Sequence, residues 1–400
     1  MTAATLPPPP PAAQDSTAIT LQIVSIVFYT FIAFLCVGLP IAVLPGYVHD
    51  HLGFSAVVAG LTIGSQYLAT LFSRPLAGRS SDNLGTRRTV LLGLIGILIS
   101  GVLTLAATLL ESLPTVSLTV LITARLLLGL SQGMIGVGTI TWCIRQVGPD
   151  QTARSISWNG IASYGAIAIG APVGVMMVSS LGFHSLGVSL ILLSGLALLV
   201  IRKREDPPLI KGERLPFWSV LARVAPYGLS LTLSSIGYGT LTTFITLYYV
   251  FRGWDGAAWC LTVFGVCFIV SRLIFINAIN RFGGFRSAIS CLVVETVGLM
   301  LLWLAPTTAF TLVGAALVGF GLSLVYPAIG VEAIKQVPSS SRGAGLSAYA
   351  LFFDLAMALS GPLMGAAALH LGYQWIFLVA ALLSLLALGL AMALQRRDSA

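Results

Sequence analysis

Apolar residues form continuous stretches of about twenty positions along most of the chain, and short polar segments separate them. About twenty apolar residues is the length an α-helix needs to cross the hydrocarbon core of a bilayer. The pattern predicts an all-α membrane protein with twelve spans, near residues 22–44, 56–77, 89–110, 117–144, 155–178, 185–201, 225–250, 257–277, 287–305, 309–331, 344–369 and 374–394.

Polar segments divide these spans into two groups of six. Residues 1–20 contain five consecutive prolines and no Lys or Arg, so they predict a disordered tail and lack the basic start of a signal peptide. The longest charged segment, 202–216, predicts a linker between bundles at 21–201 and 217–394. Residues 395–400 are expected to form a short second tail.

Composition limits the function classes. The chain is 57% hydrophobic and 8% charged with a mean hydropathy of +0.96, whereas soluble chains carry about 25% charged residues. The five cysteines lie inside apolar stretches without paired spacing, and no lysine follows a glycine as in a phosphate-binding loop. The sequence therefore predicts no enzyme, no metal site and no cofactor.

The net charge of +8 has a clear distribution. Nineteen of the twenty-one Lys and Arg fall on one side of the predicted spans, and only Arg125 and Arg252 do not. By the positive-inside rule that side is cytoplasmic, which places both termini there. The distribution of basic residues thus predicts how the chain is oriented in a lipid bilayer. It does not indicate a nucleic acid partner.

The two halves repeat each other. Ser73-Arg74 and Gly85 recur 198 positions later as Ser271-Arg272 and Gly283, and other echoes are Gly129 with Gly321, Arg154 with Arg342, and Pro172 with Pro362. Parallel repeats around a linker are typical of transporters, whose substrate site lies between the halves near the bilayer midplane.

Residues 78–88 read Gly-Arg-Ser-Ser-Asp-Asn-Leu-Gly-Thr-Arg-Arg, which resembles the loop signature of the major facilitator superfamily. Arg125 with Gly129 is similar to the family's fourth-span signature, and the likeness covers the whole chain. Segments 44–50, 157–160 and 253–258 resemble YhhS/YfcJ-type bacterial inner-membrane permeases. The departures are Asn83 and Asn280 in the two loop copies and Leu128 in the fourth span.

The loop is a candidate gate. Asp82 can face helix N-termini or guanidinium groups, and breaking such a contact would favour one of two conformations. We expect the gating residues to be Gly78, Asp82, Gly85, Arg87 and Arg88, although the two arginines also set topology.

Three charges inside predicted spans stand out: Arg125, Glu295 and Asp354. Such charges are costly in a bilayer and are candidates for function. The resemblance implies that spans 1, 2, 4, 5, 7, 8, 10 and 11 line the cavity. We therefore expect Asp354 and Arg125, on opposite halves, to couple protons to conformation, with Glu295 as the next candidate; a structural ion pair is the alternative.

Neutral polar and aromatic residues on the cavity spans predict a substrate pocket of mixed polarity: Gln66, Gln132, Trp158, Asn159, Tyr164, Ser234, Tyr238 and Tyr326. Singly, each could instead form interhelical hydrogen bonds. The helix-kink residues Gly170, Pro172, Gly174, Gly361 and Pro362 loosely resemble an antiporter signature, or serve packing alone.

The leading expectation is a monomeric, proton-coupled exporter of a small organic solute, either a drug or a sugar-like metabolite, in a bacterial inner membrane. It would use the proton gradient. An uptake symporter, a non-transporting sensor and an intramembrane enzyme remain alternatives.

Overall fold

The computed structural model describes residues 16–41, 43–54, 56–208, 215–275 and 277–399, and within them it contains helices and no strand. Twelve of the described helices have 17 residues or more. The first six are α1 (Ser16–Ile41), α3 (Ala56–Asn83), α4 (Thr86–Leu109), α5 (Pro114–Val147), α6 (Thr152–Leu181) and α7 (His184–Arg202). The second six are α8 (Phe217–Arg252), α9 (Ala258–Ile274), α11 (Gly284–Leu304), α12 (Thr308–Lys335), α13 (Arg342–Leu371) and α14 (Trp375–Ser399).

Short helical segments join some of the long helices: α2 (Leu44–Gly46), η1 (Tyr47–His51), η2 (Pro149–Gln151), α10 (Ala278–Phe282) and η3 (Ser339–Ser341). In the part of the chain described, nine helices are long and apolar enough to cross a membrane. The apolar part of α9, Trp259–Ile274, is shorter. The twelve-helix prediction is confirmed. Two predicted tails were too long. α1 begins at Ser16, inside the predicted tail 1–20, and α14 continues to Ser399, through most of the predicted tail 395–400. Residues 1–15 and 209–214 lie outside the description.

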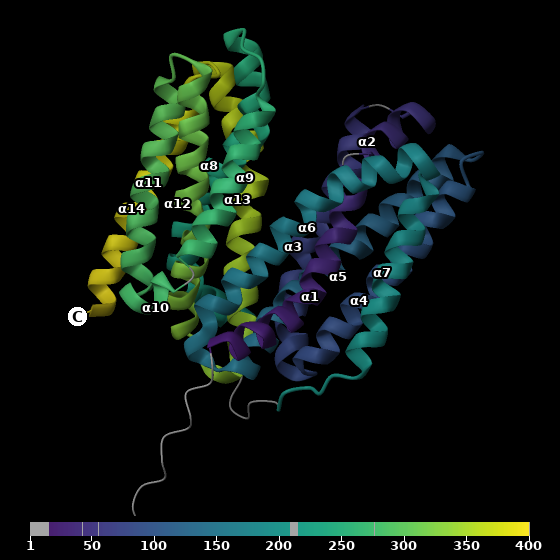
Figure 1. Ribbon diagram of the computed structural model, residues 1–400, viewed down its shortest axis with the longest axis horizontal. Coiled ribbons are helices and arrows are strands. Elements are labelled where there is room, and N and C mark those ends of the chain that lie inside the picture. The colour runs from purple at the N-terminus through teal and green to yellow at the C-terminus, as the bar shows by residue number, and fades with distance from the viewer. Residues whose placement is uncertain (1–15, 42, 55, 209–214, 276, 400) are drawn as a thin grey trace, which may run out of the picture.

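The helices form two bundles, α1–α7 and α8–α14 (Figure 1). Each has its own apolar core of buried side chains. Glycine allows close helix contacts: a Cβ on Gly129 of α5 would lie 2.1 Å from the Gln66 carbonyl oxygen of α3. Within a bundle the helices thus approach to backbone contact.

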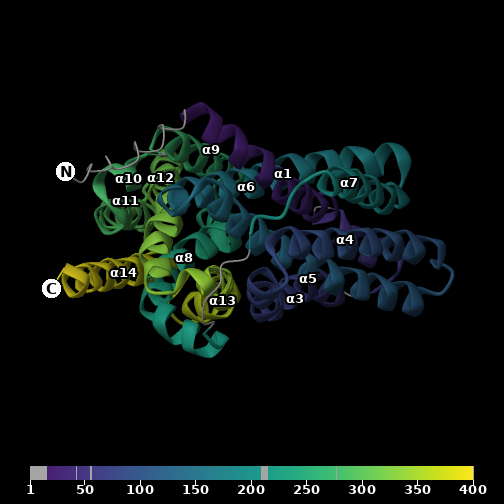
Figure 2. The same ribbon diagram turned by 90° about the horizontal axis from the view of Figure 1, so that it is seen from below.

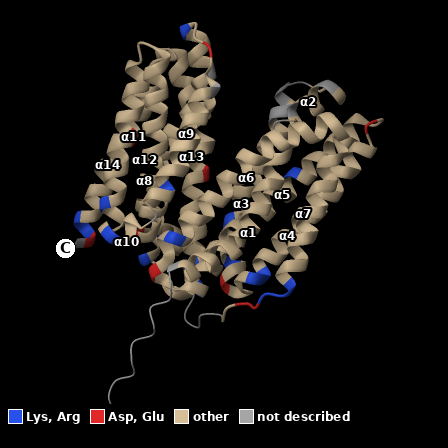
Figure 3. Ribbon diagram, viewed as in Figure 1, with Lys and Arg blue, Asp and Glu red and all other residues tan. Residues whose placement is uncertain are grey.

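The bundles meet at one end of the molecule and diverge toward the other (Figure 1). We call the first the linker end, because α7 ends and α8 begins there, and the second the far end. Seen from below, α3 lies next to α13 and α6 lies next to α12 (Figure 2). Most Lys and Arg gather at the linker end (Figure 3). Among the described residues, the contacts that hold the two bundles together therefore lie toward this end.

Candidate functional site

The contact between α3 and α13 forms the centre of the interface between the bundles. A Cβ on Gly78 would lie 2.8 Å from the Ala344 Cα, so the absence of a side chain lets the two helices touch. Residues 78–83, predicted as part of a loop, form the end of α3, and this contact places them against the start of a helix in the other bundle.

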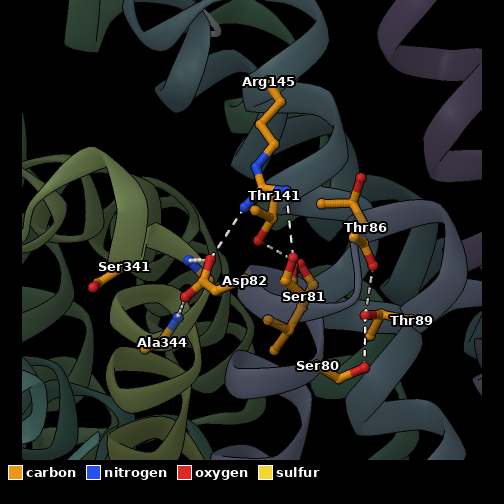
Figure 4. Close-up of polar contacts among 12 residues, drawn as sticks. Ser80, Ser81, Asp82, Thr86, Thr89, Thr141, Arg145, Ser341 and Ala344 are labelled. Carbon is orange, nitrogen blue, oxygen red and sulfur yellow. Dashed lines mark hydrogen bonds and ion pairs between the residues drawn. The ribbon is translucent and has the colours of Figure 1, made fainter. Parts of the chain in front are cut away.

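Asp82 is 4% exposed and binds across the interface (Figure 4). The backbone N–H of Gly343 donates to its Oδ1 at 3.0 Å, and that of Ala344 donates to Oδ2 at 2.9 Å. Arg145 of α5 donates to Oδ1 at 3.2 Å. A carboxylate at the α13 N-terminus completes hydrogen bonds that the helix leaves unmade and interacts favourably with its dipole.

The other loop residues act within the first bundle. Gly85 has φ of 104°, a conformation that favours glycine, at the start of α4. The Arg87 backbone N–H donates to Asp206 at 3.2 Å, and its guanidinium donates to the carbonyls of Ile201 and Arg202. Arg88 is exposed. Of the predicted gating residues, Gly78 and Asp82 are therefore the two at the bundle interface.

An ion pair lies on the same two helices, α3 and α13, farther from the linker end than the Asp82 contact. Arg74 Nε donates to Asp354 Oδ2 at 2.7 Å and Nη2 donates to Oδ1 at 3.1 Å, while the side chains are 13% and 19% exposed. The Ser347 hydroxyl donates to the Arg74 carbonyl beside it. Asp354 thus pairs with Arg74 and not with Arg125, the residue expected to act with it in proton coupling. A two-pronged guanidinium–carboxylate contact is among the stronger hydrogen-bonded pairs.

The repeat produces a different arrangement on the other side. Arg272 occupies the position of Arg74, and Tyr164 occupies that of Asp354, because α6 and α13 are each 30 residues long with proline at the same position. Arg272 donates to the Ser323 carbonyl of its own bundle and, at 3.5 Å, to the Ser157 carbonyl of the other. Carbonyls therefore replace the carboxylate in this copy.

A set of aromatic side chains begins beside Arg272, whose Cζ lies 4.7 Å from the Phe268 ring centroid, and extends through the second bundle from the contact that Tyr164 of the first bundle makes with Phe268. We call this set the aromatic row; its members, in order, are Tyr164, Phe268, Phe264, Tyr238, Phe353 and Tyr326, with successive centroids 5.0, 6.0, 5.1, 6.5 and 6.0 Å apart. The structure thus brings together the three tyrosines of the expected pocket. Trp158 is outside the row, packed against the first core.

The remaining polar candidates pair inside single bundles. Gln66 donates to Gln132 at 3.1 Å, and Asn159 accepts from Thr30 at 2.7 Å and from Thr139 at 3.2 Å. In the second bundle Ser234 donates to the fully buried Glu295 at 2.6 Å. These contacts fit the alternative of interhelical hydrogen bonding.

Arg125 lies apart from Asp354, at a small cavity in the first bundle. It is 2% exposed, and its Nε and Nη2 have no hydrogen-bond partner among the described residues. The cavity, which has room for about one water molecule, is lined by Val37, Ile41, Leu44, Ile63, Gln66, Tyr67 and Arg125.

The helix-kink candidates divide by bundle. A Cβ on Gly170 would lie 3.0 Å from Gly38, and one on Gly174 would lie 1.8 Å from the Leu39 carbonyl, so both glycines serve contact with α1. Pro172 and Pro362 lie inside uninterrupted helices. A Cβ on Gly361 would meet no described atom within 4 Å.

The sequence pattern assigned neither Arg74, Arg272 nor the phenylalanines of the aromatic row to the site. A signal for the arginines was present, because both stand in the 198-residue repeat. The charge distribution marks them as topology charges near the ends of the predicted spans 56–77 and 257–277, whereas in the structure each contacts the other bundle. For Phe264, Phe268 and Phe353 no local signal separates them from other apolar residues of a span.

Comparison with known proteins is consistent with this architecture. Residues 26–275 and 256–400 match the sequence model of the Major Facilitator Superfamily. An uncharacterized MFS-type transporter of Pseudomonas aeruginosa (strain UCBPP-PA14) is 54% identical over 392 residues, 98% of this chain and 97% of the relative. One from Burkholderia pseudomallei (strain 1106a) is 51% identical over 386 residues, 96% and 95% of the two.

Among solved structures, the human organic anion transporter MFSD10 (TETRAN) is similar with a TM-score of 0.77 and 18% identity, covering 93% of this chain and 99% of that chain. At this identity the likeness concerns the fold.

Proposed function

The chain belongs to the major facilitator superfamily, and on that premise we propose that this membrane transporter exports a small organic solute in exchange for protons, across a bacterial inner membrane. The observation that carries the proposal is the Arg74–Asp354 ion pair, which joins the two bundles inside membrane-spanning helices. One chain supplies both bundles, so the monomer is the proposed working unit.

Alternating access needs contacts that hold one end closed and can be broken. The bias of Lys and Arg toward the linker end supports a cytoplasmic linker end. The state described here is then the outward-facing one. Its cytoplasmic closure rests on Asp82 at the α13 N-terminus, on the Arg74–Asp354 pair and on the Arg272–Ser157 contact.

Protonation of Asp354 provides the coupling. A neutral Asp354 no longer attracts the Arg74 guanidinium, so proton uptake weakens a contact that exists only while the linker end is closed. A ligand shifts a conformational equilibrium by its difference in affinity for the two states, and the proton has that difference here. Arg125 is not needed in this scheme.

The solute class and the direction of transport rest on two further observations. The aromatic row crosses between the bundles at Tyr164 and Phe268 and continues in the second bundle, and its ring faces suit a drug or the apolar face of a sugar-like metabolite. Export, rather than uptake, rests on the likeness of residues 170–174 to an antiporter signature.

The test is solute flux in proteoliposomes with an imposed pH gradient, using labelled monosaccharides and aromatic drugs. We expect solute to move against the direction of proton flow and to stop moving uphill when the gradient is collapsed. Flux in the same direction as protons would replace exchange with uptake symport. No gradient-linked flux of any solute would contradict the proposal and favour a sensor or an intramembrane enzyme.

A further inference from the structure

Arg125 carries a buried charge with unused hydrogen-bond donors. Its side chain is 2% exposed, and two of its three nitrogens, Nε and Nη2, are buried without a partner in the part of the chain described. A guanidinium stays charged in proteins and presents its donors in a rigid fork. A positive charge inside a membrane helix is strongly unfavourable unless something compensates it.

The first bundle offers Arg125 no carboxylate among its described side chains. Asp82 and Asp150 lie at the linker end, and Asp82 is already bound to α13. Glu111, at the far end, accepts a hydrogen bond from Tyr47 at 3.0 Å. Arg125 lies eleven residues into α5, roughly 16 Å along the helix, between these two ends.

The cavity beside Arg125 suits the head group of an anion. Its wall has apolar side chains from α1 and α3, such as Val37 and Ile63, with Gln66 and Tyr67 as the polar neighbours. No acidic residue is among the described side chains that line it. Tyr67 is 48% exposed, so on that side the cavity lies at the protein surface, and the tyrosine hydroxyl supplies another donor.

We propose that Arg125 binds the carboxylate of the transported solute, which is therefore a small organic anion; this rests on the proposed transport function. One carboxylate oxygen enters the cavity, which has room for about one water molecule, and accepts from the guanidinium fork, while the other oxygen lies toward the Tyr67 hydroxyl. The organic part of the solute leaves the cavity past Tyr67.

The test is isothermal titration of the purified full-length protein with three carboxylates, acetate, succinate and benzoate, each paired with its neutral amide. We expect at least one carboxylate to bind at least tenfold more tightly than its amide. Arg125→Gln should lose this preference. Arg281→Gln, at an exposed arginine of α10, should keep it.

Two further variants keep the test decisive if Arg125→Gln does not fold. Arg125→Lys keeps the charge but loses the fork, and Tyr67→Phe loses only the hydroxyl, so both should weaken carboxylate binding several-fold and leave amide binding unchanged. Equal binding of carboxylates and amides, or equal binding by wild type and the Arg125 variants, would overturn the inference. So would the absence of binding by all three carboxylates, or an equal response to chloride alone.

Binding and flux are measured separately, so the two proposals can fail separately. Carboxylate binding that depends on Arg125, without gradient-linked flux, would contradict the transport mechanism and keep the binding site. Gradient-linked flux of a neutral solute that is insensitive to Arg125→Gln would keep the mechanism and overturn the binding site.

Discussion

Arg74 of α3 and Asp354 of α13, 280 residues apart in the chain, form two hydrogen bonds of 2.7 and 3.1 Å across the boundary between the bundles. Both side chains are more than four-fifths buried. The pair lies on the two helices that bring the bundles together at the linker end, so separating the bundles there requires breaking it.

Asp354→Asn should abolish proton-driven solute flux, because the amide carries no titratable proton and cannot form the charged pair with Arg74. Exchange of labelled for unlabelled solute without a gradient should remain measurable, since the substitution removes no apolar surface. Both rates are measured in proteoliposomes. If the variant still moves solute uphill, Asp354 is structural.

Glu295→Gln is the matched control for that substitution. Glu295 is also a buried carboxyl in the second bundle, but its hydrogen bond comes from Ser234 of the same bundle, and an amide oxygen can accept it equally. Flux should therefore stay coupled to the pH gradient. Loss of coupling in this variant, with coupling intact in Asp354→Asn, would exchange the roles of the two acids.

Asp82→Asn should leave the protein folded and shift it away from the state closed at the linker end. A charge at a helix N-terminus contributes up to about 2 kcal/mol in partly buried sites, and one to two kcal/mol changes a population ratio by roughly 5- to 30-fold. The alkylation rate of a cysteine at Leu346, buried between the bundles, should rise accordingly.

Asp206→Asn provides the comparison for Asp82, because Asp206 also accepts a hydrogen bond at the start of a helix, α4, but within one bundle. It should leave the Leu346 cysteine protected. Equal protection in both variants would show that the Asp82 contact has no conformational role.

Gly129→Ala should destabilise the protein, because its Cβ would lie 2.1 Å from the Gln66 carbonyl and the helices would have to separate. Overpacking of this kind costs about 1–3 kcal/mol. Gly136→Ala, on the same helix with no described atom within 4 Å of its Cβ, should be neutral or gain up to about 1 kcal/mol from helix propensity. Thermal unfolding of the detergent-purified variants measures both. Equal melting temperatures would show that the α3–α5 contact tolerates a methyl group.

Single cysteines at Glu205 and Asp255, exposed residues at the linker end and the far end, should label from opposite sides of the membrane. The charge bias predicts that a membrane-impermeant thiol reagent added outside intact cells reaches Asp255→Cys only. The positions Gly212 and Asp50 would test the same topology, but Gly212 and the Asp50 side chain lie outside the description. Labelling of Glu205→Cys from outside would invert the topology and make the described state inward-facing.

The sequence alone determined the helices, because a span is a local property: about twenty consecutive apolar residues require a helix in a bilayer. The repeat at 198 residues predicted two similar bundles, and the acid in the loop signature predicted that Asp82 faces helix N-termini or guanidinium groups. Of these predictions, only the one about Asp82 involves a partner from elsewhere in the chain, and the sequence did not identify which helix N-terminus that partner is.

Tertiary structure alone decided which polar residues share the interface. Four residues were equally expected to line the cavity because they are polar or aromatic and lie on cavity spans: Gln66, Asn159, Ser234 and Tyr238. The first three form hydrogen bonds inside a single bundle, whereas Tyr238 lies in the aromatic row. A helix turns about 100° per residue, so small differences in rotation decide whether a side chain faces its own bundle or the other. The partner of Asp354 depends on that rotation in two helices 280 residues apart, which no local pattern contains.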